Sequence, residues 1–221
     1  MSILDALREI LALGGPVVAI LIAMSVVTLA VTLYKLWQFA ASGVGRHRVL
    51  SQALDAWDAG DKQAARARLA KSNSYLAPLV GVAMDAPDAP GLDQRLDAEA
   101  GLALAGLERG FRLLDTVAQL APLLGLFGTV LGMIEAFRSL QTAGSSVDPS
   151  LLAGGIWVAL VTTAVGLAVA MPTSMVLSWF ESRTARERVF ADKALRTVLV
   201  PGQALPLAEG AQSMAATPGH A

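Results

Sequence analysis

The chain has 221 residues, of which 54% are hydrophobic and 16% are charged, with a mean hydropathy of +0.55. Soluble domains carry roughly 25% charged residues, so this composition excludes an ordinary soluble enzyme or a disordered protein. The 17 basic and 18 acidic residues nearly balance, which excludes the basic excess typical of nucleic-acid binding. There is no cysteine, and His47 and His220 are the two histidines, so we expect neither a metal nor a cofactor.

Three stretches of the chain contain no charged residue. They cover residues 10–34, 116–134 and 149–180, and they are 25, 19 and 32 residues long. About 20 apolar residues suffice for a helix to cross the roughly 30 Å core of a bilayer. The sequence therefore predicts an all-α membrane protein with three transmembrane helices.

The first apolar stretch differs from a cleavable signal peptide. The charges before it sum to −1, whereas a signal peptide has a basic start and an apolar region of roughly 7–15 residues. Gly14, Gly15 and Pro16 separate it from a short amphipathic N-terminus. It ends at the basic and aromatic segment Lys35 to Phe39, which we expect to lie at the membrane interface.

The segment between the first two spans is polar and rich in alanine. Leu50, Leu54 and Trp57 repeat at helical spacing, and Gly60 ends that helix. Two more short helices are expected over 61–71 and 76–85.

The second and third spans are expected to continue beyond the membrane as long helices. The helical period resumes at Leu92 and predicts one uninterrupted helix to Leu140. The third span is expected to run to Leu199, before Pro201. The second and third transmembrane helices would thus extend into a cytoplasmic helical bundle.

The distribution of basic residues predicts the topology. Lys35 to Arg112 holds ten of the 17 basic residues, and Arg183 to Arg196 holds five more. By the positive-inside rule these segments face the cytoplasm, and the N-terminus and the short turn between the last two spans face out. The expected parts are a periplasmic amphipathic N-terminus (1–14), transmembrane helix 1 (15–38), a cytoplasmic helical domain (39–112), transmembrane helix 2 (113–138), a periplasmic turn (139–150), transmembrane helix 3 (151–180), a cytoplasmic helix (181–200) and a disordered tail (201–221).

Small residues follow one face of each of the last two spans. Such faces let helices approach closely within a membrane, and prolines inside a span free a backbone carbonyl. The residues expected to pack helices or face a partner are Gly125, Gly128, Gly132, Gly166, Pro122 and Pro172.

Three threonines lie near the middle of these spans: Thr129, Thr162 and Thr163. A buried threonine commonly bonds a carbonyl of its own helix, so each alone indicates packing. Together, on small-residue faces, they are candidates for lining a polar path. Asp115 and Glu135 lie at the ends of the second span, where we expect interfacial positions. No arrangement of a base and a nucleophile suggests an enzyme.

The motifs LAPLLGLFGTVLGM at 120–133 and VTTAVGLAVAMP at 161–172 resemble the MotA/TolQ/ExbB proton channel family. The resemblance covers about 111–188, a third of the chain. Three spans favour the ExbB/TolQ branch over the four-span MotA branch, and we favour an ExbB-like protein.

The resemblance implies a ring, expected to be a homopentamer, in the inner membrane of a Gram-negative cell. The ring would enclose an ExbD- or TolR-like single-span partner whose membrane aspartate takes the proton, and would drive a TonB- or TolA-like periplasm-spanning protein. Thr129 and Thr163 match the family's channel-facing threonines, and Val158 stands where the family often has a glutamate. A TolQ-like role in envelope maintenance and a passive membrane scaffold are the alternatives.

Overall fold

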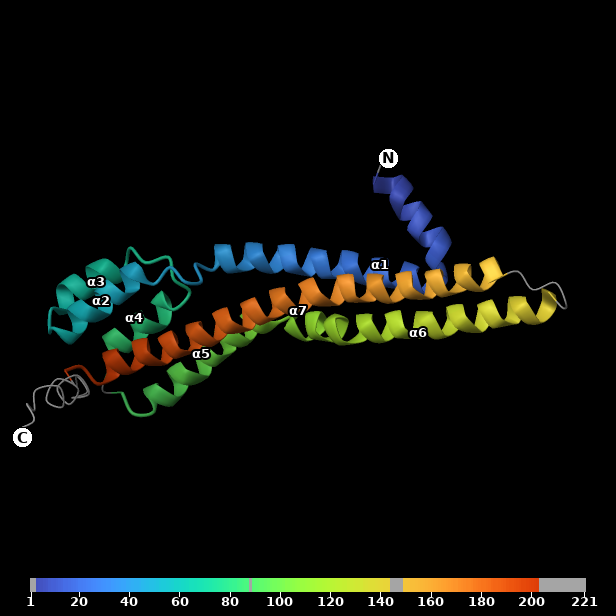
Figure 1. Cartoon of the computed structure of the whole chain (residues 1–221). Helices are drawn as coiled ribbons and strands as arrows, with labels where there is room; N and C mark the ends of the chain where they lie inside the picture. The colour runs from blue at the N-terminus through green and yellow to red at the C-terminus, as the bar shows by residue number, and fades with distance from the viewer. Residues whose placement is uncertain (1–2, 88, 144–148, 203–221) are drawn as a thin grey trace, which may run out of the picture. The chain divides into compact units, whose positions relative to one another are not determined.

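The structure is a computed structural model that describes residues 3–87, 89–143 and 149–202 (Figure 1). Within these ranges the chain is all-α and contains no strand. Its helices are α1 (Ile3–Ala41), α2 (Arg48–Asp58), α3 (Lys62–Leu69), α4 (Ala77–Asp85), α5 (Leu92–Glu108), α6 (Phe111–Ala143) and α7 (Pro149–Leu199).

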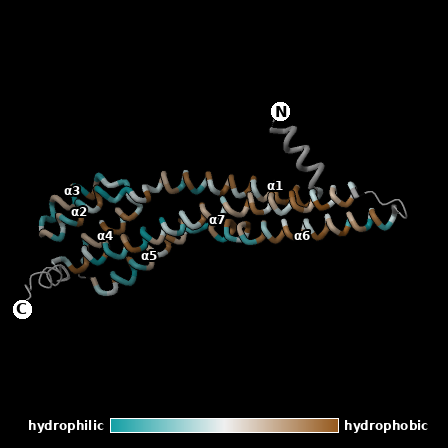
Figure 2. The backbone as a smooth tube through the Cα atoms, in the orientation of Figure 1, coloured by the Kyte–Doolittle hydropathy of each residue, from teal (hydrophilic) through white to brown (hydrophobic). Residues whose placement is uncertain are grey.

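The chain divides into two compact units. Unit 1 comprises residues 1–41 and 105–185, and unit 2 comprises 42–104 and 186–221. Three stretches are long and apolar enough to cross a membrane: Gly15–Ala41, Leu92–Thr142 and Leu152–Leu199. Figure 2 shows hydrophobic residues along α1, α6 and much of α7, and hydrophilic residues over α2 and α3. The prediction of an all-α membrane protein with three such helices is confirmed.

Unit 1 carries its large apolar side chains on the outside. Examples are Val26, Leu123, Trp157 and Met175, which are between 59% and 75% exposed. Such an exterior suits lipid or another apolar helix as its surroundings. α1 is bent at Gly15, whose backbone is non-helical (φ 61°, ψ −159°), as the Gly-Gly-Pro sequence predicted.

The expected continuous helix from Leu92 to Leu140 is interrupted, so that prediction was wrong. α5 ends at Glu108 and α6 begins at Phe111, with Gly110 between them at φ 91°. A side chain is strained in this left-handed conformation. A Cβ at Gly110 would also meet Lys35 Cε at 3.4 Å. The break therefore depends on a glycine and on a side chain from α1.

Lys35 is buried, although its position near the end of α1 predicted an interfacial residue. It is 1% exposed, and its Nζ donates to Leu107 O at 2.9 Å and to Gln38 Oε1 at 2.7 Å. Nζ also lies 5.6 Å from the centre of the Phe111 ring. Phe39 is likewise buried. Lys35 thus supplies a donor to a carbonyl at the end of α5, where helical partners run out.

We expect Lys35→Met to lower the free energy of unfolding by about 1–3 kcal/mol, because the buried Leu107 carbonyl would lose its hydrogen-bond donor. Methionine keeps most of the apolar stem. Thermal unfolding in detergent checks this, with exposed Lys62→Met as the control for loss of a lysine. Equal melting temperatures for Lys35→Met and the parent chain would contradict the capping role.

The core of unit 2 is formed by residues of α2, α3, α4, part of α5 and the end of α7. Its members are apolar residues buried to at least 92%, among them Leu50, Trp57, Val80, Leu96 and Leu195. Trp57 Nε1 donates to Val198 O at 3.1 Å. The three predicted short helices are present as α2, α3 and α4.

Some predicted segments lie partly outside the described residues. The turn expected at 139–150 includes residues 144–148, and the tail expected at 201–221 includes 203–221. For the amphipathic N-terminus, the backbone of residues 3–14 is helical, while the side chains of 1–14 lie outside the description.

Candidate functional site

Helices α6 and α7 approach each other through small residues in unit 1. A Cβ at Gly125 would lie 3.1 Å from Thr163 Cα, and one at Gly132 would lie 3.2 Å from Ala159 Cβ. A Cβ at Gly128 would overlap the Thr162 side chain. All three glycines of the α6 motif therefore lie against α7, in the manner of small-residue helix pairs.

Gly166 on α7 lies directly against the backbone of α6. A Cβ there would lie 2.6 Å from the backbone oxygen of Ala121 and 3.1 Å from Gly125 Cα. A backbone atom cannot swing aside as a side chain can. The two helices can therefore keep this distance only with glycine at 166.

Pro122 and Pro172 lie inside α6 and α7, respectively. Proline has no N–H, so the carbonyls of Ala118 and Ala168 lose their usual helical donors. Pro172 is exposed and Pro122 half-buried within the chain. Each span thus has a point where its own hydrogen bonding is weakened.

The three threonines hold different positions. Thr163 Oγ1 donates across the helix pair to Gly125 O at 3.2 Å. Thr162 is 2% exposed and donates to Val158 O at 2.8 Å. Thr129 is half-buried and donates to Leu126 O at 2.6 Å. Of the three, Thr163 joins the two helices, whereas Thr129 and Thr162 each bond their own helix.

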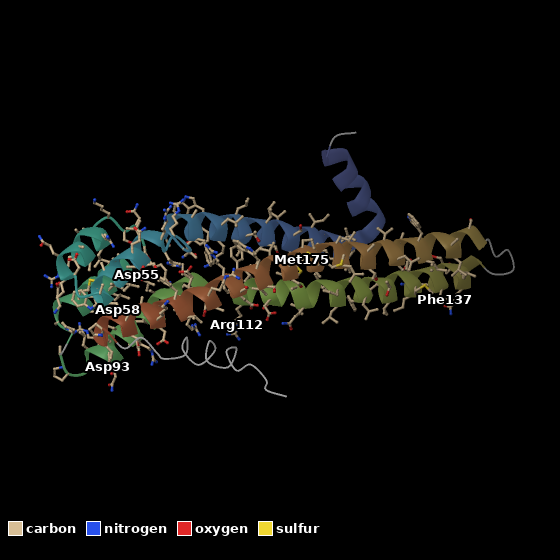
Figure 3. All side chains as sticks on the ribbon, turned by 60° about the vertical axis from the view of Figure 1, so that its left-hand side comes forward. Asp55, Asp58, Asp93, Arg112, Phe137 and Met175 are labelled. Atoms are coloured by element: carbon tan, nitrogen blue, oxygen red, sulfur yellow. The ribbon has the colours of Figure 1, made fainter. Side chains whose placement is uncertain are left out.

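Thr129 lies on a strip of α6 that it shares with apolar side chains. Val130, Met133, Ile134 and Phe137 line the same shallow groove. Figure 3 labels Phe137 on α6 and Met175 on α7, and both side chains are largely exposed. Arg138 and Gln141 complete the lining, so the groove presents the Thr129 hydroxyl among apolar side chains, with polar residues toward the end of α6.

The second span carries two acidic residues, and both are more exposed than the three threonines. Asp115 is exposed and accepts from Gln119 Nε2 at 2.7 Å, and Glu135 is exposed as well. Among the described residues, no three histidine or acidic side chains gather as metal ligands would. The site therefore offers hydroxyls and carbonyls, both of which can bind water, while the hydroxyls alone can donate to a carboxylate.

Sequence reasoning missed the burial of Lys35 and the half-buried position of Gln38 near the start of α6. A signal was present, because Val31, Lys35 and Phe39 are four residues apart and therefore share one helix face. Phe39 on that face is buried. The spacing would have placed Lys35 toward the other helices rather than toward the interface.

These features define a multi-pass α-helical membrane protein whose spans are packed through glycine. The profile of the family described as "MotA/TolQ/ExbB proton channel family" matches residues 56–192. The chain belongs to this family.

Individual relatives agree with the ExbB/TolQ branch. The putative biopolymer transport protein ExbB-like 1 of Synechocystis is 34% identical over 168 residues, 72% of this chain and 64% of that protein. Biopolymer transport protein exbB1 of Vibrio cholerae is 45% identical over 78 residues, 34% of each chain. The Tol-Pal system protein TolQ of Pseudomonas aeruginosa is 37% identical over 91 residues, 39% of each chain. The matched regions thus span between about a third and two thirds of these relatives.

Proposed function

We propose that this chain is the ring-forming subunit of an energiser that is driven by the proton-motive force and powers outer-membrane transport. The observation that carries the proposal is Thr163, which links α6 and α7 at a glycine-lined contact where the family's channel threonine is expected. Membership of a proton channel family and relatives named for biopolymer transport support it.

The proposed mechanism follows from the cost of charge in a membrane. One charge that crosses the membrane gains roughly 2.3 kcal/mol per 100 mV. A carboxylate in lipid is costly to ionise, so it would lose its proton only where hydroxyls or water meet it. Thr129 and Thr163 would supply these contacts. The carboxylate would belong to a partner, since the acidic residues of α6, Asp115 and Glu135, are exposed near its ends.

The proposed assembly is a homopentamer in the bacterial inner membrane, surrounded by lipid. It would enclose an ExbD- or TolR-like single-span protein and act on a TonB- or TolA-like protein. We propose membrane boundaries of 15–38, 113–138 and 151–180. The basic residues concentrated in 35–112 and 183–196 support a periplasmic N-terminus and a cytoplasmic C-terminus.

Two other functions have specific support. A TolQ-like role in envelope maintenance is supported by the match to a Tol-Pal system protein. A passive scaffold is supported by Thr129 and Thr162, whose hydroxyls bond carbonyls of their own helices, as packed threonines do.

Proton flux separates the energiser from the scaffold. The chain and its co-purified single-span partner are placed in liposomes, and a pH-sensitive dye reports proton entry after a potential is imposed. The energiser reading predicts flux that requires both proteins and the partner's membrane carboxylate. Flux equal to that of empty liposomes would favour the scaffold.

A further inference from the structure

Unit 2 contains an acid–base pair that the proposed function does not use, formed by a half-buried histidine and a buried carboxylate. His47 Nε2 lies 2.8 Å from Glu187 Oε1, and Glu187 is 1% exposed. Because His47 directly precedes α2 and Glu187 lies on α7, the contact holds two distant parts of the chain together. A carboxylate that is buried to this degree needs a partner to stay ionised.

Two aromatic residues complete the surroundings of the pair. Phe190 stacks on the His47 ring with centroids 3.9 Å apart. Burial, and then the negative charge of Glu187, raise the pKa of the Tyr75 hydroxyl. Tyr75 thus stays protonated and can act as a donor near the carboxylate. Phe190 thus covers one face of the imidazole, while 20% of the His47 side chain stays exposed.

The polar atoms of this cluster are incompletely paired. Tyr75 Oη, Glu187 Oε2 and His47 Nδ1 are buried, and none has a hydrogen-bond partner within the part of the chain that the structure describes. A proton on the imidazole makes the pair neutral overall, whereas its loss leaves a buried anion with incomplete solvation. The charged residues that adjoin the pair along the chain are Arg46, Arg48, Arg186 and Arg188.

We propose that His47, Glu187 and Tyr75 form a binding site for a single proton in unit 2, and that loss of this proton weakens the packing of the end of α7. The inference uses contacts within unit 2 alone, so it does not rest on the proposed channel function. The sign follows from the charges: with the proton bound the pair is neutral, and without it the carboxylate is buried as a bare anion. Unit 2 should therefore become less stable as the pH rises and the proton leaves the pair.

The small number of histidines makes the site directly observable. His47 and His220 are the two histidines of the chain, so His220→Gln leaves one imidazole. Nitrogen NMR of the full chain in lipid nanodiscs, with labelled histidine, follows its protonation between pH 5 and 9. We expect a single step in the His220→Gln parent, and at least ten-fold weaker proton binding when Glu187→Gln removes the carboxylate charge.

A second variant tests the same site in the opposite direction. Tyr75→Phe removes the hydroxyl near the Glu187 carboxylate, which can turn to donate to it, so the anion loses a source of solvation and the site should hold its proton to a higher pH. Asp192→Asn is the matched control, because Asp192 is an exposed carboxylate on α7 that pairs with Arg196. It should leave the step unchanged. If Glu187→Gln fails to fold, the comparison of Tyr75→Phe with Asp192→Asn decides the question.

Packing is measured by backbone hydrogen exchange of residues 186–199 over the same pH range. We expect exchange in the parent to rise at the step seen for His47, and exchange in Glu187→Gln to change little there. If the protonation step of His47 is unchanged in both Glu187→Gln and Tyr75→Phe, the proposed proton-binding site is wrong. A shifted step with pH-independent exchange would overturn its effect on packing.

Discussion

Replacing Thr163 by valine should reduce proton flux at least 100-fold and abolish energised transport, while the ring stays assembled. Valine has nearly the same shape, so the close contact between α6 and α7 survives. What disappears is the hydroxyl that donates to Gly125 O and that, in the proposed mechanism, turns its single O–H from this carbonyl to the partner's carboxylate. A loss of one to two hydrogen bonds to a developing charge is worth about 3 kcal/mol, or roughly a factor of 100.

Two further variants make this prediction specific. Thr163→Ser keeps the hydroxyl and should retain most of the flux. Thr197→Val removes a hydroxyl that bonds Lys193 O on the exposed surface of the same helix, and it should behave as the unmodified chain. Flux is measured in liposomes, and assembly by size-exclusion chromatography. Normal flux in Thr163→Val would remove Thr163 from the mechanism.

Gly166→Ala should cause a large loss of stability, because its methyl group would lie 2.6 Å from the Ala121 backbone oxygen. The helices must separate to admit it, which would also loosen the contacts at Gly125 and Thr163. Overpacking of this kind costs about 1–3 kcal/mol. The expected fall in melting temperature is about 2–10 °C for a chain of this size.

Gly154→Ala is the matched control, since it adds the same methyl group to the same helix with no atom within 4 Å of the new Cβ. It should keep the melting temperature or raise it slightly, because alanine favours helix. Both variants are compared by thermal unfolding in the same detergent. If the two variants unfold at the same temperature, close packing at Gly166 does not stabilise the helix pair.

The sequence predicted the features that depend on local composition. Absence of charge indicated the spans, and glycines spaced three and four residues apart indicated the face of α6 that meets α7. Gly60 and the Gly-Gly-Pro motif indicated where helices end or bend. Each of these signals is contained in a few neighbouring residues, so it can be recognised without the fold.

Features that depend on distant residues could not be predicted. The break at Gly110 was missed because two other glycines, Gly101 and Gly106, are tolerated within α5. What distinguishes Gly110 is a φ of 91° beside the Lys35 stem. His47 and Glu187 lie 140 residues apart in the sequence, and no local motif around either residue indicates that the two are in contact.

For the threonines, too, part of the site could be predicted from the sequence and part required the fold. Their place near the middle of the spans followed from the sequence, but which hydroxyl crosses between helices required the register of α6 against α7. That register assigns the bond to Thr163 rather than to Thr162. Val158, where the family often has a glutamate, contributes its carbonyl as the acceptor for Thr162, and nothing in the structure explains that substitution.

Native mass spectrometry of the complex, extracted gently from its own membranes, tests the central proposal most directly. We expect a ring of five identical copies of this chain that holds a smaller protein with a single membrane span. The smaller protein should carry an aspartate within that span. A monomer or dimer without any small partner, found in several detergents, would contradict the account and favour a passive scaffold.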